Sequence, residues 1–272
     1  MRIAISNIAW RVDEEAAVRE LLSARGVDAV EIAPSKIGPK PAELALGDVR
    51  AYRDFWGLHG IEIVAMQALL FGRPDFALFG TDAQRAELLT YLAGVVRSGG
   101  ELGAHALVFG SPKNRLRGAL SEQEAARVCA PFWRELGQVA VASGTCLCIE
   151  PNPPEYGADW IHSAADARAL VEFVAHPGFG LHLDAAALHM AGEGAADVKK
   201  CGGAIRHFHA SEVQLAPVRA GTDVPHAAFA EVLREIGYTN VVSIEMRQVE
   251  TSASNLPHLE RALDFVQRVY GG

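Results

Sequence analysis

Short apolar runs alternate along the chain with longer stretches in which apolar residues recur at helical spacing, and this pattern repeats eight times. The short runs predict strands at residues 2–6, 29–32, 61–66, 104–109, 146–150, 180–184, 205–209 and 241–245. The longer stretches predict helices at about residues 13–24, 47–58, 82–98, 121–142, from 163 onward, 194–200, 225–235 and 252–269. Such alternation indicates a parallel sheet. Eight repeats in 272 residues fit a single α/β domain, a closed (β/α)8 barrel over residues 1–272.

Serine and glycine residues mark several of the expected helix ends. Ser121 and Ser163 each precede an acidic residue by three positions, a pattern typical of a helix N-terminus. Gly26 and the Gly99-Gly100 pair are expected to end helices. The loops at residues 67–81 and 151–162 are long and follow strands, so we expect them to shape a pocket.

A metal-capable side chain closes four consecutive predicted strands: Glu150, Asp184, His209 and Glu245. These residues are separated by 34, 25 and 36 positions, about one strand–helix repeat each. Parallel strands end at the same edge of a barrel, so the four side chains should converge there. One such carboxylate alone could equally cap a helix or pair with an arginine, but four together predict a divalent-metal site.

The predicted site is rich in oxygen and has a single nitrogen. That donor set suits Mn²⁺, Mg²⁺ or Co²⁺, and Zn²⁺ would also bind it. Because the set lacks thiolates, it fits a catalytic metal better than a structural zinc. Cys129, Cys146, Cys148 and Cys201 show no zinc-ligand spacing and are expected to be thiols, mostly in the core.

The same segments resemble the xylose isomerase-like TIM barrels. This family includes D-tagatose 3-epimerase-type ketose epimerases, hydroxypyruvate isomerase, inosose dehydratase and endonuclease IV. The resemblance runs through the whole chain and is carried by Ile149-Glu-Pro-Asn, Leu183-Asp, Phe208-His-Ala-Ser-Glu and Ser243-Ile-Glu-Met. It implies that Glu150, Asp184, His209 and Glu245 bind one divalent cation. It also implies that Glu150 and Glu245 are the catalytic acid/base pair.

The resemblance implies an isomerase or epimerase that acts on a sugar or sugar derivative through a metal-stabilised enediolate. A dehydratase of the inosose type on the same scaffold is an alternative, because enolisation can be followed by loss of water. A non-catalytic sugar-binding barrel is a less favoured alternative. DNA cleavage of the endonuclease IV type uses histidines after strands three and four, and this sequence has none there.

Further polar residues are candidates for substrate binding, although loop packing or surface ion pairs would explain each of them as well. They are Gln67, Lys113, His189, Glu212, His226 and Arg247. Ketose epimerases resemble one another in a histidine three positions after the metal-binding aspartate, where this chain has Ala187. His189 lies two positions further on. Glu31 also ends a strand and could bind a sugar hydroxyl, and Arg115 could attract a phosphate or carboxylate.

Charge and hydropathy narrow the choice of partners. The formal net charge is −8, with basic residues scattered, so nucleic acid is not an expected partner. No signal-peptide pattern or apolar stretch of membrane-spanning length is present, which favours a cytoplasmic protein without membrane contact. A small carbohydrate is the expected partner. Apolar residues in the long loops favour homo-oligomerisation.

Overall fold

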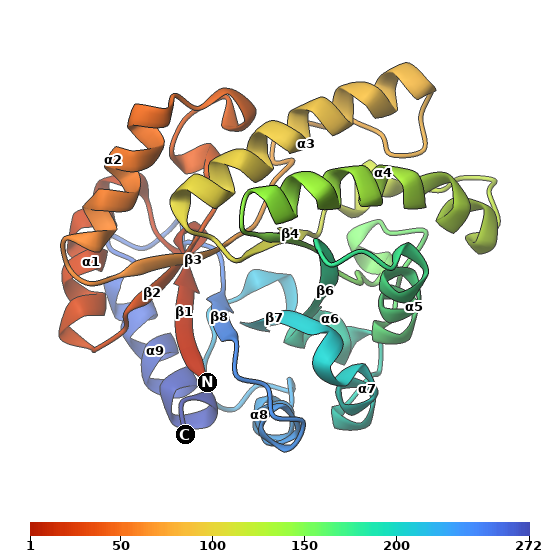
Figure 1. Ribbon diagram of the computed structural model, residues 1–272. Coiled ribbons are helices and arrows are strands. Elements are labelled where there is room, and N and C mark those ends of the chain that lie inside the picture. Colours follow the sequence, from red (N-terminus) through yellow and green to blue (C-terminus); the bar gives the residue numbers. More distant parts are fainter.

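The computed structural model describes residues 1–272, and its eight strands form a closed parallel barrel surrounded by helices (Figure 1). The strands are β1 Arg2–Ser6, β2 Ala29–Ile32, β3 Glu62–Met66, β4 Ala106–Phe109, β5 Cys146–Ile149, β6 Phe179–Asp184, β7 Ile205–Ser211 and β8 Val241–Glu245. Each strand pairs with its neighbours in sequence, and β8 closes the barrel on β1. The predicted (β/α)8 fold is therefore confirmed.

The helices lie outside the barrel and follow the strands in order (Figure 1). They are α1 Glu15–Ala24, α2 Leu46–Gly57, α3 Asp82–Leu102, α4 Glu122–Ala142, α5 Ala164–Val174, α6 Ala185–Met190, α7 Ala195–Cys201, α8 His226–Glu235 and α9 Leu256–Tyr270. The short helix α6 was not predicted. Its sequence, Ala-Ala-Ala-Leu-His-Met, is buried over its first four residues and therefore shows no polar face. No helix is both long and apolar enough to cross a membrane.

Small and polar residues fill the interior of the barrel in separate layers. A cluster of small residues that includes Ala4, Ala29, Ala65, Ala106 and Cys148 packs in one layer. The larger apolar core lies mainly between the strands of the barrel and the helices that surround it. The polar layer follows from the register between β6 and β7. In that register His182 lies beside His207, and Asp184 lies beside His209. Metal-capable side chains from two strands are thereby brought side by side.

Gly99 and Gly100 do not end a helix, contrary to the prediction, because α3 continues to Leu102. Gly103, with φ of 91°, ends it instead. A Cβ atom on Gly100 would lie 2.3 Å from the carbonyl oxygen of Ser143, at the end of α4. A Cβ atom on Gly99 would lie 2.7 Å from the Leu107 side chain of β4. The glycine pair therefore allows α3 to pack closely against both α4 and the barrel, at a cost in helix propensity. Gly26 follows α1 with φ of 65°, in agreement with the prediction.

Glu14 ties the start of α1 to the start of α9. Its carboxylate accepts hydrogen bonds from the backbone N–H (2.7 Å) and the side-chain amide (2.8 Å) of Asn255, and from Ser254 (3.1 Å). Burial by itself would raise the pKa of Glu14, but these hydrogen bonds lower it to about 2. A carboxyl group with a depressed folded-state pKa stabilises the fold above its ordinary pKa. That contribution is lost as the pH falls toward the folded-state value.

We therefore expect Glu14→Gln to destabilise the protein by on the order of 2 kcal/mol at pH 7, where wild-type Glu14 is ionised. The difference from wild type should shrink between pH 5 and pH 3, as measured by urea unfolding at each pH. Asp13→Asn is the matched control, because the Asp13 side chain is 80% exposed. A difference in unfolding free energy that stays constant with pH would contradict this account.

Candidate metal centre

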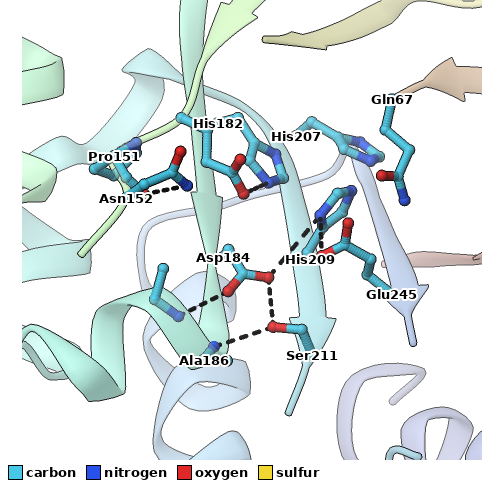
Figure 2. Close-up of polar contacts among 12 residues, drawn as sticks. Gln67, Pro151, Asn152, His182, Asp184, Ala186, His207, His209, Ser211 and Glu245 are labelled. Carbon is cyan, nitrogen blue, oxygen red and sulfur yellow. Dashed lines mark hydrogen bonds and ion pairs between the residues drawn. The ribbon is translucent and has the colours of Figure 1, made fainter. Parts of the chain in front are cut away.

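Four side chains predicted from the strand ends gather at one end of the barrel. Glu150 follows β5, Asp184 ends β6, His209 lies near the end of β7, and Glu245 ends β8. One ligand atom each from Glu150, Asp184 and His209 lies within 4.8 Å of the others. Nδ1 of His209 is 3.3 Å from a Glu245 oxygen and 3.9 Å from an Asp184 oxygen (Figure 2). We call Glu150, Asp184, His209 and Glu245 the outer site.

Asp184 is held by two groups that fix the orientation of its carboxylate. One oxygen caps helix α6 by accepting the backbone N–H of Ala187 at 2.7 Å. The other accepts the hydroxyl of Ser211, whose own oxygen accepts the N–H of Ala186 at 3.0 Å (Figure 2). Burial, followed by repulsion from Glu245 and Glu150, raises the pKa of Asp184 to about 7. A nearby cation would relieve this crowding of negative charge.

His209 is oriented by Glu31, which lies one residue before the end of β2 and is completely buried. The Nε2–H group of His209 donates to the Glu31 carboxylate, with both oxygens at 3.1 Å. Burial would lower the pKa of His209, but the carboxylates of Glu31 and Glu245 raise it well above its usual value. Because Nε2 faces Glu31, Nδ1 faces the outer site. A carboxylate behind a ligating histidine is the common arrangement in protein metal sites.

The residues of the outer site fit a divalent cation. His209 Nδ1 is buried and has no hydrogen-bond partner, although it lies among carboxylates. Burial also raises the pKa of Glu150. Three carboxylates and one imidazole nitrogen form an oxygen-rich donor set suited to Mn²⁺, Mg²⁺ or Co²⁺. A cation there would accept the free nitrogen lone pair and neutralise the carboxylates together.

A cavity of about 530 Å³ opens over the outer site. Glu150, Asp184 and Glu245 line it together with residues from both long loops, as expected from the sequence. The loop residues are Gln67, Ala68, Leu70, Phe71, Asn152 and Tyr156. The cavity therefore combines acidic, amide and apolar surfaces, which is the usual composition of a small-molecule site.

The six predicted substrate-binding residues fall into two groups. Gln67, Glu212 and Arg247 line the cavity. Lys113, His189 and His226 do not line it, because Lys113 is exposed, His189 lines a neighbouring cavity and His226 is buried. His226 instead lies behind Glu212, with its Nε2 atom 3.1 Å from the Glu212 carboxylate and its Nδ1 atom 2.9 Å from the Tyr270 hydroxyl.

Several residues that support the site were missed or interpreted differently from the sequence. Glu31 contacts His209 and is shielded from the cavity, and Ser211 contacts Asp184. Arg115 is only 1% exposed, so it has no surface for a phosphate. Its guanidinium donates to the backbone carbonyl of Glu150 at 2.7 Å and to the side-chain oxygen of Asn152 at 3.1 Å. Arg115 therefore anchors the end of β5.

Gly110, immediately after β4, makes room for the Glu150 carboxylate. A Cβ atom at residue 110 would lie 2.0 Å from Oε2 of Glu150. We expect Gly110→Ala to displace that carboxylate and lower divalent-metal affinity by about 10–100-fold, while the barrel stays folded. Metal titration monitored by calorimetry tests this, with Gly47→Ala as a control for a glycine whose Cβ would meet open space. Unchanged metal affinity in Gly110→Ala would show that Glu150 does not have to occupy this position.

A closed (β/α)8 barrel with a polar cavity at the carboxyl ends of its strands defines a TIM barrel with its candidate site in the usual place. The chain belongs to the xylose isomerase-like TIM barrel family, whose sequence profile matches residues 19–269. The predicted family is thereby confirmed. No curated protein sequence matched this chain.

Solved structures share this fold along their whole length. A D-psicose 3-epimerase crystallised in the presence of D-fructose is 18% identical, with a TM-score of 0.81 and full coverage of both chains. A D-psicose 3-epimerase with D-tagatose from Clostridium cellulolyticum H10 is 16% identical, with a TM-score of 0.80 and 99% coverage of both chains. An IolI protein with a bound zinc atom is 19% identical, with a TM-score of 0.78 and coverage of 100% of this chain and 98% of that chain.

Proposed function

We propose that this protein is a divalent-metal-dependent isomerase or epimerase that acts on a sugar or sugar derivative. Glu150, Asp184, His209 and Glu245 would hold one ion of Mn²⁺, Mg²⁺ or Co²⁺, with Zn²⁺ as a further candidate. The observation that carries the proposal is the buried Nδ1 atom of His209, which has no partner and faces two carboxylates. Membership of the family and the epimerases among the similar structures support the reaction class.

The two glutamates would move the protons. Glu150 and Glu245 line the same cavity from β5 and β8, which β6 and β7 separate, so they approach a bound substrate from different directions. When bound, the divalent ion would supply Lewis acidity that stabilises negative charge on a substrate carbonyl oxygen. In the metal-free protein burial raises the pKa of Glu150, and a poorly hydrated carboxylate of this kind is suited to accept a carbon-bound proton.

The route of the proton would then decide the product. Removal by one glutamate and return from the other, on the opposite face of the same carbon, gives epimerisation. Transfer by a single glutamate between neighbouring carbons gives aldose–ketose isomerisation. Gln67, Glu212 and Arg247 line the cavity and are suited to bind substrate oxygens, while Leu70 and Phe71 contribute apolar wall. Lys113, His189 and His226 stand outside this cavity and are not assigned a role in binding.

Metal analysis combined with isotope exchange tests the proposed function. We expect about one Mn, Mg, Co or Zn ion per chain after gentle purification or reconstitution, and loss of bound Mn²⁺ in Asp184→Ala and in His209→Ala. The metal-bound protein should catalyse incorporation of deuterium from the solvent into a ketose or aldose substrate. Release of water with formation of an enone would identify a dehydratase instead. A protein that never binds metal in the outer site would contradict the proposal.

A further inference from the structure

Three histidine rings lie together beneath the outer site, inside the barrel. His182 comes from β6, and His207 and His209 come from β7 (Figure 2). All three residues are at most 1% exposed. The ring centroids of His182 and His209 are 4.1 Å apart, and that of His207 is 5.4 Å from His182 and 5.2 Å from His209. We call this group the inner histidine cluster.

The inner histidine cluster holds buried nitrogen atoms that the protein leaves without a partner. Neither ring nitrogen of His182 has a hydrogen-bond partner, and Nε2 of His207 has none either. A buried polar group without a partner costs about 1–3 kcal/mol, so native proteins nearly always satisfy it with protein, water or an ion. The outer site accounts for Nδ1 of His209. Nε2 of His182 lies 3.5 Å from Glu150 and Nε2 of His207 lies 3.5 Å from Glu31, and neither contact is a hydrogen bond.

A carboxylate already faces the cluster. Glu31 lies 3.1 Å from Nε2 of His209 and 3.5 Å from Nε2 of His207, and it is completely buried. One ring nitrogen from each histidine lies within 4.8 Å of the other two. Zn–N bonds of about 2.0–2.1 Å would bring these nitrogens to about 3.4 Å from one another, so the rings would have to close by roughly 1 Å. Side-chain rotation can supply a movement of that size.

We propose that the inner histidine cluster is a second cation site, selective for an imidazole-preferring ion such as Zn²⁺ or Co²⁺. His182 and His207 supply two nitrogen ligands. His209 supplies Nε2 when its proton moves to Nδ1, which lies 3.3 Å from the residue 245 side chain, and Glu31 supplies the compensating negative charge. Imidazole suits zinc and cobalt, whereas a carboxylate-rich set such as the outer site suits manganese and magnesium. The inner site would therefore bind zinc or cobalt when the outer site is empty, whether or not the outer site carries out sugar chemistry.

Cobalt titration of a variant with a weakened outer site tests the proposal. Glu150→Gln/Glu245→Gln removes two outer carboxylates and retains all three histidines. We expect this double variant to bind about one Co²⁺ per chain, with visible absorption typical of nitrogen ligation. Adding His182→Gln or, separately, His207→Gln should lower the cobalt affinity at least tenfold. His189→Gln should leave it unchanged, because His189 lines a different cavity.

The outcomes separate this inference from the proposed function. Circular dichroism and urea unfolding check that each variant is folded, and the two single-histidine changes provide independent tests. The inner site would be overturned if the double variant bound no cobalt, or if its cobalt affinity did not respond to either His182→Gln or His207→Gln. Manganese binding to wild type, lost in Asp184→Ala, reports on the outer site alone. The proposal for each site can therefore be contradicted without affecting the other.

Discussion

Glu150→Gln and Glu245→Gln are each expected to reduce turnover of the true substrate by about 10²–10⁴-fold, because each removes a group that transfers protons. Glutamine keeps the size of the side chain and one ligand oxygen, so both variants should remain folded. Steady-state kinetics at saturating metal measure the loss, which should fall on kcat more than on KM. Incorporation of deuterium into the substrate by each variant shows which glutamate transfers the proton on each face of the reacting carbon.

A matched control for these two variants is Glu212→Gln. Glu212 lines the same cavity and accepts hydrogen bonds from Thr222 at 2.6 Å and His226 at 3.1 Å, but it lies outside the outer site. Its replacement should change KM more than kcat. Rates near wild type in both Glu150→Gln and Glu245→Gln would overturn the two-glutamate mechanism, even if metal binding were intact.

Glu31→Gln is expected to lower the affinity of the outer site for Mn²⁺ by about 10–100-fold, although Glu31 does not line the cavity. The carboxylate accepts Nε2–H of His209, and the neutral amide that replaces it no longer fixes the tautomer that presents Nδ1 to the ion. The protein should also lose stability, by about 3–5 kcal/mol if the loss resembles that of other broken buried ion pairs. Calorimetric metal titration and urea unfolding measure the two effects.

Glu62→Gln is the matched control for Glu31→Gln. Glu62 starts β3, at the end of the barrel away from the cavity, and pairs with Arg2 at the surface with a 69% exposed side chain. It should affect neither Mn²⁺ affinity nor stability by more than about 0.5 kcal/mol. Equal manganese affinities for Glu31→Gln and wild type would show that His209 keeps its orientation without this carboxylate.

The barrel and the positions of the outer-site residues could be predicted from the sequence because each depends on a local pattern. Short apolar runs ending in Glu150, Asp184, His209 and Glu245 identified both the strands and the side chains that gather at one end of the barrel. Parallel strands in a barrel end at one edge, so four local observations gave one site. Helix boundaries followed from the caps at Ser121 and Ser163, which the structure confirms.

What could not be predicted depends on contacts between residues distant in sequence. Glu31 and His209 are separated by 178 positions, and nothing near Glu31 indicates that its partner is a histidine rather than a substrate. Arg115 was a candidate to attract a phosphate or carboxylate, yet it lies buried beneath the loop that begins after β5. Gly99 and Gly100 lie within a helix at positions where Leu107 of β4 and Ser143 at the end of α4 approach closely, an effect that helix propensities do not include.

Asp184 joins the outer site, where we propose that an ion binds, to part of the cavity wall. It is both an outer-site carboxylate and the N-cap of α6, whose Ala186 and Ala187 line the cavity. A carboxylate drawn toward a cation pulls against the backbone N–H of Ala187 and the Ser211 hydroxyl that supports Ala186. The identity of the ion should therefore adjust the width of the cavity as well as its charge. Substrate preference measured with Mn²⁺ and with the smaller Mg²⁺ should differ for this reason.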